Sequence, residues 1–341
     1  MLRKFAYNKI FRTTGMLFLL LFLLCRIKRS GRSCRYNKRK QNKKYRNPAS
    51  QERDFFVGEN NKQNMKKIAI QGVKGSFHDI AAHDYFKGED IELVCCDTFE
   101  SLFDEMKRDG SLLALVAIEN TIAGSILHNY ELLRNSGLTI VGEYKLRISH
   151  SIICLPDDDW DDITEVNSHP VALAQCYAFL KQHPNMRVVE ADDTAGSAEQ
   201  ISMEKRHGHA AICSKYAASL YGMKILEEGI EDNKHNFTRF LVLADPWNAD
   251  LLRDTHLCNK SSLVFALPHE EGSLSQVLSI FSFYKINLTK IQSLPIIGRE
   301  WEYLFYIDVI YDDYTRFHQC LDAIIPLISE LKILGEYVSK Q

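Results

Sequence analysis

A continuous apolar run, Leu-Leu-Ala-Leu-Val-Ala-Ile at residues 112–118, constrains the fold more than any other feature of this sequence. The run has the length of one β-strand and no polar face, which is typical of a strand covered on both sides. Strand patterns at residues 67–71 and 91–95 precede it, and a helix with one apolar face is expected after Thr98. This alternation of strands and helices predicts an α/β fold.

A second α/β unit is expected from about residue 147 onward. Strand patterns at residues 150–155 and 210–213 alternate with helices that should begin at Pro170 and Thr194. Two units of similar size suit a hinged cleft. We therefore predict a two-lobed domain over residues 65–245, in which lobe 1 comprises residues 65–146 and 225–245 and lobe 2 comprises residues 147–224.

The pattern changes after a polar linker at residues 246–260. Strand and helix patterns then follow in the order β-α-β-β-α-β over residues 261–341, which is ferredoxin-like. The last strand is expected at residues 335–338. The second helix of this unit is expected to carry Phe317, Leu321, Ile324, Ile328 and Leu331 on one face.

Charge is distributed unevenly along the chain. Residues 1–64 hold 17 Lys and Arg against 3 Asp and Glu, whereas the remaining residues hold 25 against 41. Binding to nucleic acid needs clustered basic side chains at the phosphates. The acidic balance therefore argues against a nucleic-acid partner for the folded part of the chain.

The basic extension contains an apolar run at residues 16–25. This run is shorter than the roughly 20 residues that span a bilayer, and no small-residue cleavage pattern follows it. Since Met65-Lys66-Lys67 leads directly into a strand, we interpret residues 1–64 as an extension outside the folded enzyme, produced by a start site placed too early. A membrane-proximal or targeting segment is the alternative. We expect the protein to be cytoplasmic.

Cysteine and histidine spacing gives no sign of a metal site. The nine cysteines show no C-x-x-C spacing and lie mostly in apolar runs, as buried free thiols in a reducing compartment do. The twelve histidines form no ligand-spaced cluster. We therefore expect no metal.

The turn Gly72-Val73-Lys74-Gly75-Ser76 joins a predicted strand to a predicted helix. It lacks the Lys of a phosphate-binding Walker A loop and the third Gly of a dinucleotide fingerprint. Free N–H groups at the start of a helix can nevertheless bind an anion such as a carboxylate. Ser76 is a candidate for this role, and a purely structural turn is the alternative.

Polar residues follow the apolar run directly, at Glu119, Asn120, Thr121 and Ser125. Ligands of open α/β sheets bind at the carboxyl ends of the strands, so these side chains are candidates for a binding site. Capping of a loop is the alternative for Asn120 and Thr121.

Two helix starts in the second unit also carry small hydroxyl side chains. They are Ser168-His169-Pro170, which leads on to Gln175, and Asp193-Thr194-Ala195. Each alone would be interpreted as a helix cap. Together they supply helix N-termini that could face lobe 1.

Asn236-Phe237-Thr238-Arg239-Phe240 leads into the last strand of the two-lobed domain. Neighbouring side chains of a strand point to opposite faces, so Thr238 and Arg239 cannot both face a cleft unless the backbone is irregular. A structural salt bridge is therefore the alternative to an anion-binding role for Arg239.

Taken in order, these segments resemble the prephenate dehydratase family over residues 67–341. The matching segments are Gly72-x-x-Gly75-Ser76-Phe77, Ile118-Glu119-Asn120-Thr121-x-x-Gly124-Ser125, Ser168-His169-Pro170-x-Ala172-Leu173-x-Gln175-Cys176, Asp193-Thr194-Ala195 and Thr238-Arg239-Phe240. The C-terminal unit resembles the ACT domain of that family. Departures are Val73 and Ser76, where the family usually has proline and threonine.

The resemblance implies two lobes like those of a periplasmic binding protein and a lyase without a cofactor. Because residues 1–64 are neither long nor periodic enough for a helical chorismate mutase domain, we expect the enzyme to be monofunctional. Its reaction would be the conversion of prephenate to phenylpyruvate, in a homodimer or homotetramer. The catalytic candidates are Thr238, Glu119, Asn120 and Gln175. The substrate-binding candidates are Ser76, Thr121, Ser125, Ser168, Thr194 and Arg239.

The resemblance also implies an ACT domain that senses L-phenylalanine. Where the family has Glu-Ser-Arg-Pro, this chain has Gln-Ser-Leu-Pro, without the acid and the arginine. The effector-binding candidates are Gly272, Ser273, Leu274, Gln292, Ser293, Leu294 and Pro295. Phenylalanine control is accordingly an expectation that needs its own test.

Three other readings of the sequence are open. Arogenate dehydratase performs the same reaction on the aminated substrate. A non-catalytic solute-binding protein would suit two lobes, because fold alone does not fix function. A regulatory protein built on the ACT domain is the third, with the basic extension as its only nucleic-acid contact.

Overall fold

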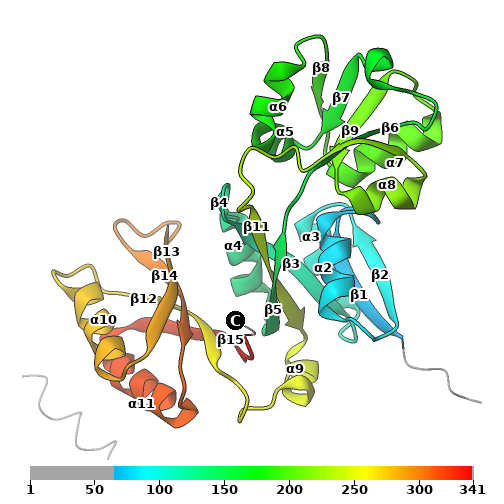
Figure 1. Cartoon of the computed structure of the whole chain (residues 1–341). Coiled ribbons are helices and arrows are strands. Elements are labelled where there is room, and N and C mark those ends of the chain that lie inside the picture. The colour runs from blue at the N-terminus through cyan, green and yellow to red at the C-terminus, as the bar shows by residue number, and fades with distance from the viewer. Residues whose placement is uncertain (1–64, 340–341) are drawn as a thin grey trace, which may run out of the picture. The chain divides into compact units, whose positions relative to one another are not determined.

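The computed structural model describes residues 65–339, and they contain three β-sheets with helices packed on them (Figure 1). The predicted basic extension at residues 1–64 lies outside the described residues. Within residues 65–339, no helix combines the length and the apolar content needed to cross a bilayer.

The first sheet has the strand order β2-β1-β3-β11-β5, and the short β4 pairs with β3. Its strands are β1 (Lys66–Gln71), β2 (Ile91–Cys96), β3 (Leu113–Asn120), β4 (Gly124–Ser125), β5 (Thr139–Arg147) and β11 (Phe237–Ala244), and its helices are α2 (Phe77–Tyr85), α3 (Phe99–Arg108), α4 (Leu127–Ser136) and α9 (Pro246–Leu252). β1 pairs in parallel with β2 and β3, whereas β11 runs antiparallel to β3 and β5.

The apolar run at residues 112–118 lies in and just before β3, in the middle of this sheet. Ala114, Val116 and Ile118 belong to the core on one face, whereas Leu115 and Ala117 belong to the core on the other. This alternation confirms the prediction of a strand covered on both sides.

The second sheet has the order β10-β6-β9-β7-β8 and forms lobe 2. Its elements are β6 (Ser151–Cys154), η1 (Trp160–Asp162), β7 (Glu165–Ser168), α5 (Pro170–Gln175), α6 (Tyr177–Gln182), β8 (Arg187–Glu190), α7 (Thr194–Glu204), β9 (His209–Cys213), α8 (Lys215–Tyr221) and β10 (Lys224–Glu228). β10 pairs with β6, so the prediction that lobe 1 resumes at residue 225 is wrong. Sequence periodicity does not specify which sheet an edge strand joins.

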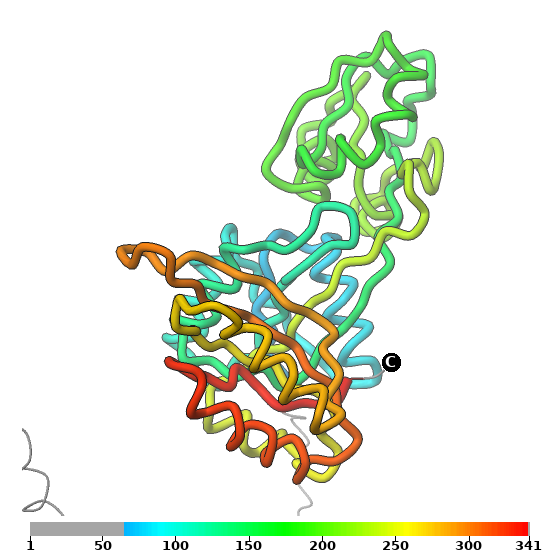
Figure 2. Tube along the Cα trace, turned by 90° about the vertical axis from the view of Figure 1, so that its left-hand side faces the viewer, coloured from blue at the N-terminus to red at the C-terminus, as the bar shows by residue number. Residues whose placement is uncertain are grey.

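The chain passes between the two lobes twice, along neighbouring segments (Figure 2). Ile148 N donates to Asn236 O at 2.8 Å, and Ile230 N donates to His150 O at 3.0 Å. These hydrogen bonds hold the outgoing and the returning segment together.

The C-terminal unit is a four-stranded antiparallel sheet of order β13-β14-β12-β15 with two helices. Its elements are β12 (Lys260–Ala266), α10 (Ser273–Phe283), β13 (Asn287–Pro295), β14 (Tyr303–Ile310), α11 (Tyr314–Ile324), η2 (Ile325–Leu327) and β15 (Ser329–Tyr337). The predicted βαββαβ order is confirmed. The predicted second helix is too long, because Pro326 cannot continue it; Ile328 and Leu331 lie beyond its end but still pack on the same core.

The C-terminal unit and lobe 1 share one hydrophobic core. Val264 and Tyr306 cluster there with Leu133 and Ile140. A Cβ atom on Gly335 of β15 would lie 2.3 Å from the carbonyl oxygen of Ile140 in β5, so only glycine fits at this contact. The close approach of these backbones fixes one edge of the unit against lobe 1.

Candidate active site between the lobes

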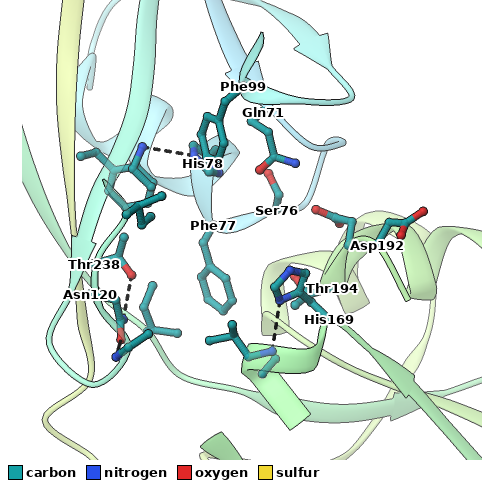
Figure 3. Close-up of a pocket in the computed structure, with 18 of the residues that line it drawn as sticks. Gln71, Ser76, Phe77, His78, Phe99, Asn120, His169, Asp192, Thr194 and Thr238 are labelled. Atoms are coloured by element: carbon teal, nitrogen blue, oxygen red, sulfur yellow. Dashed lines mark hydrogen bonds between the residues drawn. The ribbon is translucent and has the colours of Figure 1, made fainter. Parts of the chain in front are cut away.

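A cavity of about 460 Å³ lies between the two lobes (Figure 3). Most of its lining comes from the carboxyl ends of strands and the first turns of helices. Among the sequence-predicted candidates, those that line it are Ser76, Asn120, Gln175, Thr194 and Thr238.

Helices α2, α3, α4, α5 and α7 begin at the wall of this cavity, and a side chain caps each of them except α4. Ser76 Oγ accepts from Asp79 N at 3.3 Å at the start of α2, and Thr98 caps α3. The cap of α7 is Asp193, whose Oδ1 accepts from Gly196 N at 2.7 Å, and Thr194 is the first helical residue. The positive ends of these helices favour a negatively charged ligand.

Thr238 and Asn120 face each other across two neighbouring strands. They are directly paired between β11 and β3, and Asn120 Nδ2 donates to Thr238 Oγ1 at 3.0 Å. The orientation of the Asn120 amide is fixed because its Oδ1 accepts from the backbone N–H groups of Ile122 and Ala123 at 3.0 and 2.9 Å. Since Oγ1 accepts from Asn120, the hydroxyl proton of Thr238 is available to a ligand.

Hydrogen bonds extend from this pair into lobe 2 through Gln175. Gln175 Nε2 lies 3.4 Å from Asn120 Oδ1, and Gln175 Oε1 accepts from His150 Nε2 at 2.9 Å and from Asn236 Nδ2 at 2.8 Å. Asn236 Oδ1 accepts in turn from Asn120 Nδ2 at 2.7 Å. This chain of amides connects the orientation of Asn120 to the position of lobe 2.

Sequence analysis did not select His150 or Asn236 as site residues. Asn236 is fully buried. It stands two positions before Thr238 in the same motif, and this position could have identified it as a site residue. From the sequence, His150 was interpreted only as part of a strand. In the structure, burial lowers the pKa of His150, and the hydrogen bond to Gln175 partly opposes this shift. An isolated histidine before a strand carries no local pattern that identifies it.

His78 is a further cavity residue that sequence analysis missed. Its Nε2 lies 3.4 Å from the backbone nitrogen of Ala117, which donates to it, and its ring contacts the rings of Phe99 and Phe240. Burial lowers the pKa of His78 to about 4. The imidazole is therefore neutral at neutral pH, with Nε2 as the acceptor.

The charged side chains at the cavity are acidic. Asp97, Glu100, Asp192 and Asp193 line it, whereas no Lys or Arg stands among the residues of the described chain that form its wall. Burial raises the pKa of Asp193. An anionic ligand would therefore depend on helix N-termini and neutral donors.

Arg239, Glu119 and Ser125 do not line this cavity. Arg239 Nε donates to Glu143 at 2.7 Å, and its two terminal nitrogens donate to Asp308 at 2.5 Å and to Tyr337 at 3.1 Å. Burial alone would raise the pKa of Glu119, but Lys290 and Arg239 outweigh it and the pKa is lowered. For Arg239, these contacts favour the structural salt bridge over the anion-binding alternative.

Two other candidates bond to the backbone and lie outside the cavity. Ser168 is fully buried, and its Oγ donates to Ile212 O at 2.5 Å. Thr121 Oγ1 donates to His235 O and accepts from Phe237 N, both at 3.0 Å. A role in binding a substrate stays a prediction for both residues.

The effector-binding candidates lie in two places in the C-terminal unit. Ser273 and Leu274, which follow Gly272 at the start of α10, line a small cavity of about 140 Å³ together with Trp301 and Tyr303. The segment Gln292-Ser293-Leu294-Pro295 lies in β13, paired with Tyr303–Tyr306 of β14, and does not line that cavity.

Within the part of the chain that the structure describes, no group of three or more His, Cys, Asp or Glu side chains is arranged to hold a metal ion.

The sequence model of the family described as prephenate dehydratase matches residues 68–247. The chain is 37% identical over 283 residues to arogenate dehydratase/prephenate dehydratase 2, chloroplastic, of Arabidopsis thaliana, with 80% of this chain and 72% of that protein covered.

Two solved structures are similar in fold and in sequence. One is described as GqqA, a novel type of quorum quenching acylases, with a TM-score of 0.70, 28% identity, and 81% of this chain and 98% of that chain covered. The other is prephenate dehydratase from Arthrobacter aurescens in complex with L-Phe, with a TM-score of 0.69, 25% identity, and 80% and 89% covered.

Proposed function

The chain belongs to the prephenate dehydratase family, and from this premise we propose that it converts prephenate to phenylpyruvate in the cavity between its lobes. The observation that carries the proposal is the Asn120–Thr238 pair, which presents a hydroxyl proton to that cavity. Membership of this family implies a dehydratase, and in this proposal the pair supplies the hydrogen-bond donor that the departing oxygen of a dehydration needs.

The reaction needs a donor at one particular atom. When the ring carboxylate of prephenate leaves as CO2, the electron pair of the broken C–C bond enters the ring, and the ring hydroxyl leaves as hydroxide. That hydroxide takes up a proton to give water, and the ring becomes aromatic. The step consumes one proton, which the solvent supplies, and it requires no oxidant.

In this proposal, Thr238 donates its hydroxyl hydrogen bond to the departing oxygen. A threonine hydroxyl is a weak acid, so it stabilises the charge that develops on the leaving group and does not protonate that group by itself. Asn120 fixes the hydroxyl, and Gln175 with Asn236 fixes Asn120. Donors that are oriented before the reaction stabilise a developing charge without reorganising.

The substrate carboxylates would be held at the starts of the helices. α2, α3 and α7 begin at the cavity wall, and the backbone N–H groups there can bind anions without a cationic side chain. Leaving the carboxylates without a bound cation also assists the loss of CO2, because a tight ion pair would stabilise the starting state.

Arogenate is the second candidate substrate, and the charge of the cavity favours it. Arogenate carries an ammonium group where prephenate carries a keto group, and Asp192 at the cavity could pair with a cation. The relative from Arabidopsis thaliana is named for both activities. The same pair, Asn120 and Thr238, would act on the ring of either substrate.

We also propose that L-phenylalanine binds to the C-terminal unit. The support is the small cavity beside Ser273 and Leu274, together with the L-Phe bound to the enzyme from Arthrobacter aurescens. The altered Gln292–Pro295 segment lies outside that cavity, so its departure from the family pattern does not remove the cavity wall.

The test is to assay the full chain with prephenate, with arogenate and with an acylated quorum-sensing signal, each with and without L-phenylalanine. Phenylpyruvate from prephenate supports the main proposal, and phenylalanine formed faster from arogenate would make arogenate the substrate. Hydrolysis of the acylated signal alone would replace the proposal with an acylase activity. An unchanged rate together with an unchanged melting temperature in the presence of L-phenylalanine would contradict the proposed binding.

A further inference from the structure

The strand pair that carries Asn120 and Thr238 has a second, opposite face. In the register of β3 and β11, Thr238 is paired with Asn120 and the next pair is Arg239 with Glu119. Successive side chains of a strand point to opposite faces. Asn120 and Thr238 therefore face the cavity, while Glu119 and Arg239 face the C-terminal unit.

Six charged side chains meet on this reverse face, which we call the charge cluster. It consists of the cations Arg239, Lys260 and Lys290 and the carboxylates Glu119, Glu143 and Asp308. The charges balance, and all but Glu119 are almost entirely buried, with Lys290 exposed by 11%. Three of the six come from strands β12, β13 and β14 of the C-terminal unit.

Arg239 is tied to the C-terminal unit by two hydrogen bonds, to Asp308 and to Tyr337. Asp308 accepts a second bond from Ser262 at 2.5 Å, and Ser262 also lies 2.9 Å from the hydroxyl of Tyr337. Lys260 donates to both oxygens of Glu143 at 2.8 Å. The guanidinium thus has little freedom to move.

Lys290 joins the two strands of the loop that forms a wall of the cavity. Its Nζ donates to Glu119 and, at 2.8 Å, to Ser125 Oγ. Glu119 and Ser125 are paired between β3 and β4, and the residues between them include Asn120 and Ala123, which line the cavity. One ammonium group of the C-terminal unit therefore holds both ends of this loop.

We propose that Lys290 and Asp308 of the C-terminal unit are positioning residues for the reaction, acting through Glu119 and Arg239 on the Asn120–Thr238 pair. This inference rests on the proposed function, because it concerns the same cavity. The C-terminal unit then supplies part of the structure that catalysis requires, in addition to any effector that it binds.

The test uses Lys290→Met in the full chain, since methionine keeps an unbranched apolar side chain and removes the ammonium group, which also lies 5.4 Å from the centre of the Tyr130 ring. A small displacement of a catalytic group lowers the rate without weakening binding, so we expect kcat to fall about ten-fold while KM stays within about two-fold. Lys290→Arg should restore most of the rate. Lys285→Met, at an exposed position of the same unit, is the matched control and should match the parent.

Hydrogen exchange of the amides at residues 121–126 provides a readout without substrate, and we expect it to be faster in Lys290→Met. A folded Lys290→Met protein with the parent's kcat would overturn the inference, even if exchange were faster, because Lys290 would then be only structural. If the parent converts neither substrate, the proposed function fails. The positioning role in this reaction then fails with it, and the exchange rate reports only whether Lys290 holds the loop at residues 121–126.

Discussion

The two faces of the β3–β11 strand pair differ in every property that matters for catalysis. The cavity face presents Asn120 and Thr238, which are neutral and open to a ligand. The reverse face presents Glu119 and Arg239 to four further charges that are nearly all buried. Adjacent residues of the same two strands thus serve opposite purposes.

The charged reverse face stabilises the strand pair, whereas the neutral cavity face contacts the substrate in the proposed reaction. Each charge on the reverse face is already paired with an opposite charge, so these side chains hold the strands in place and are not available to a substrate. Neutral donors on the other face can respond to charge that appears only during the reaction. An arginine next to a catalytic threonine in sequence is therefore no sign that both contact the substrate.

The largest effect is expected from Arg239→Met, which removes the central cation of the reverse face and should lower the free energy of unfolding. This change leaves Glu143 and Asp308 buried without their shared cation. Removing one partner of a buried ion pair typically costs about 3–5 kcal/mol, so the free energy of unfolding should fall by that amount in urea denaturation.

Arg316→Met is the matched control, because Arg316 pairs with Asp313 at the surface, with both side chains about half exposed. Exposed pairs contribute roughly 0–1 kcal/mol, and the control should change stability by no more than that. Equal losses in the two variants would show that burial of the charge cluster adds nothing to stability.

Thr238→Val, which removes the hydroxyl from the cavity face, should lower kcat and leave the free energy of unfolding nearly unchanged. Valine keeps the shape, and Asn120 Nδ2 retains Asn236 Oδ1 at 2.7 Å and Phe237 O at 3.2 Å as acceptors. Loss of one oriented donor typically lowers kcat by about 10²–10³, and we expect a loss of that size. Steady-state kinetics and urea denaturation on the same preparation measure both quantities.

Thr238→Ser is the control for this variant, since it keeps the hydroxyl and should retain most of the turnover. Turnover of Thr238→Val within a few-fold of the parent would remove Thr238 from the mechanism. It would also remove the contrast between the two faces.

Features that depend only on neighbouring residues in the chain were predictable from the sequence. The alternating burial of β3, the capping of α2 by Ser76 and of α3 by Thr98, and the opposite directions of Thr238 and Arg239 all follow from helix and strand geometry. Each depends only on neighbours within a few positions. The sequence therefore predicts the three units and most of their elements.

Features that depend on distant partners were not predictable. Glu119 and Asn120 are adjacent polar residues after the same apolar strand, yet one bonds Lys290, which is 171 positions away, and the other lines the cavity. Ser168 resembles a ligand-binding hydroxyl but bonds a carbonyl of β9. A polar side chain at a strand end gives no local indication of which partner it will meet.

The smallest effect concerns His78 of α2, a titratable side chain of the cavity wall that accepts a hydrogen bond from Ala117 N of β3. Its pKa of about 4 lies below the value of 6.5 expected in the unfolded chain, so the unfolded chain binds more protons between these values. Stability should therefore fall as the pH is lowered through 6.5, by about 2 kcal/mol from pH 8 to pH 5 for this residue. His78→Gln should lose less stability than the parent over that range, whereas His256→Gln at an exposed position should follow the parent. Urea denaturation at pH 8, 6.5 and 5 measures the free energy of unfolding of each protein. If it falls equally with pH in the parent and in His78→Gln, His78 is not held neutral by the cavity.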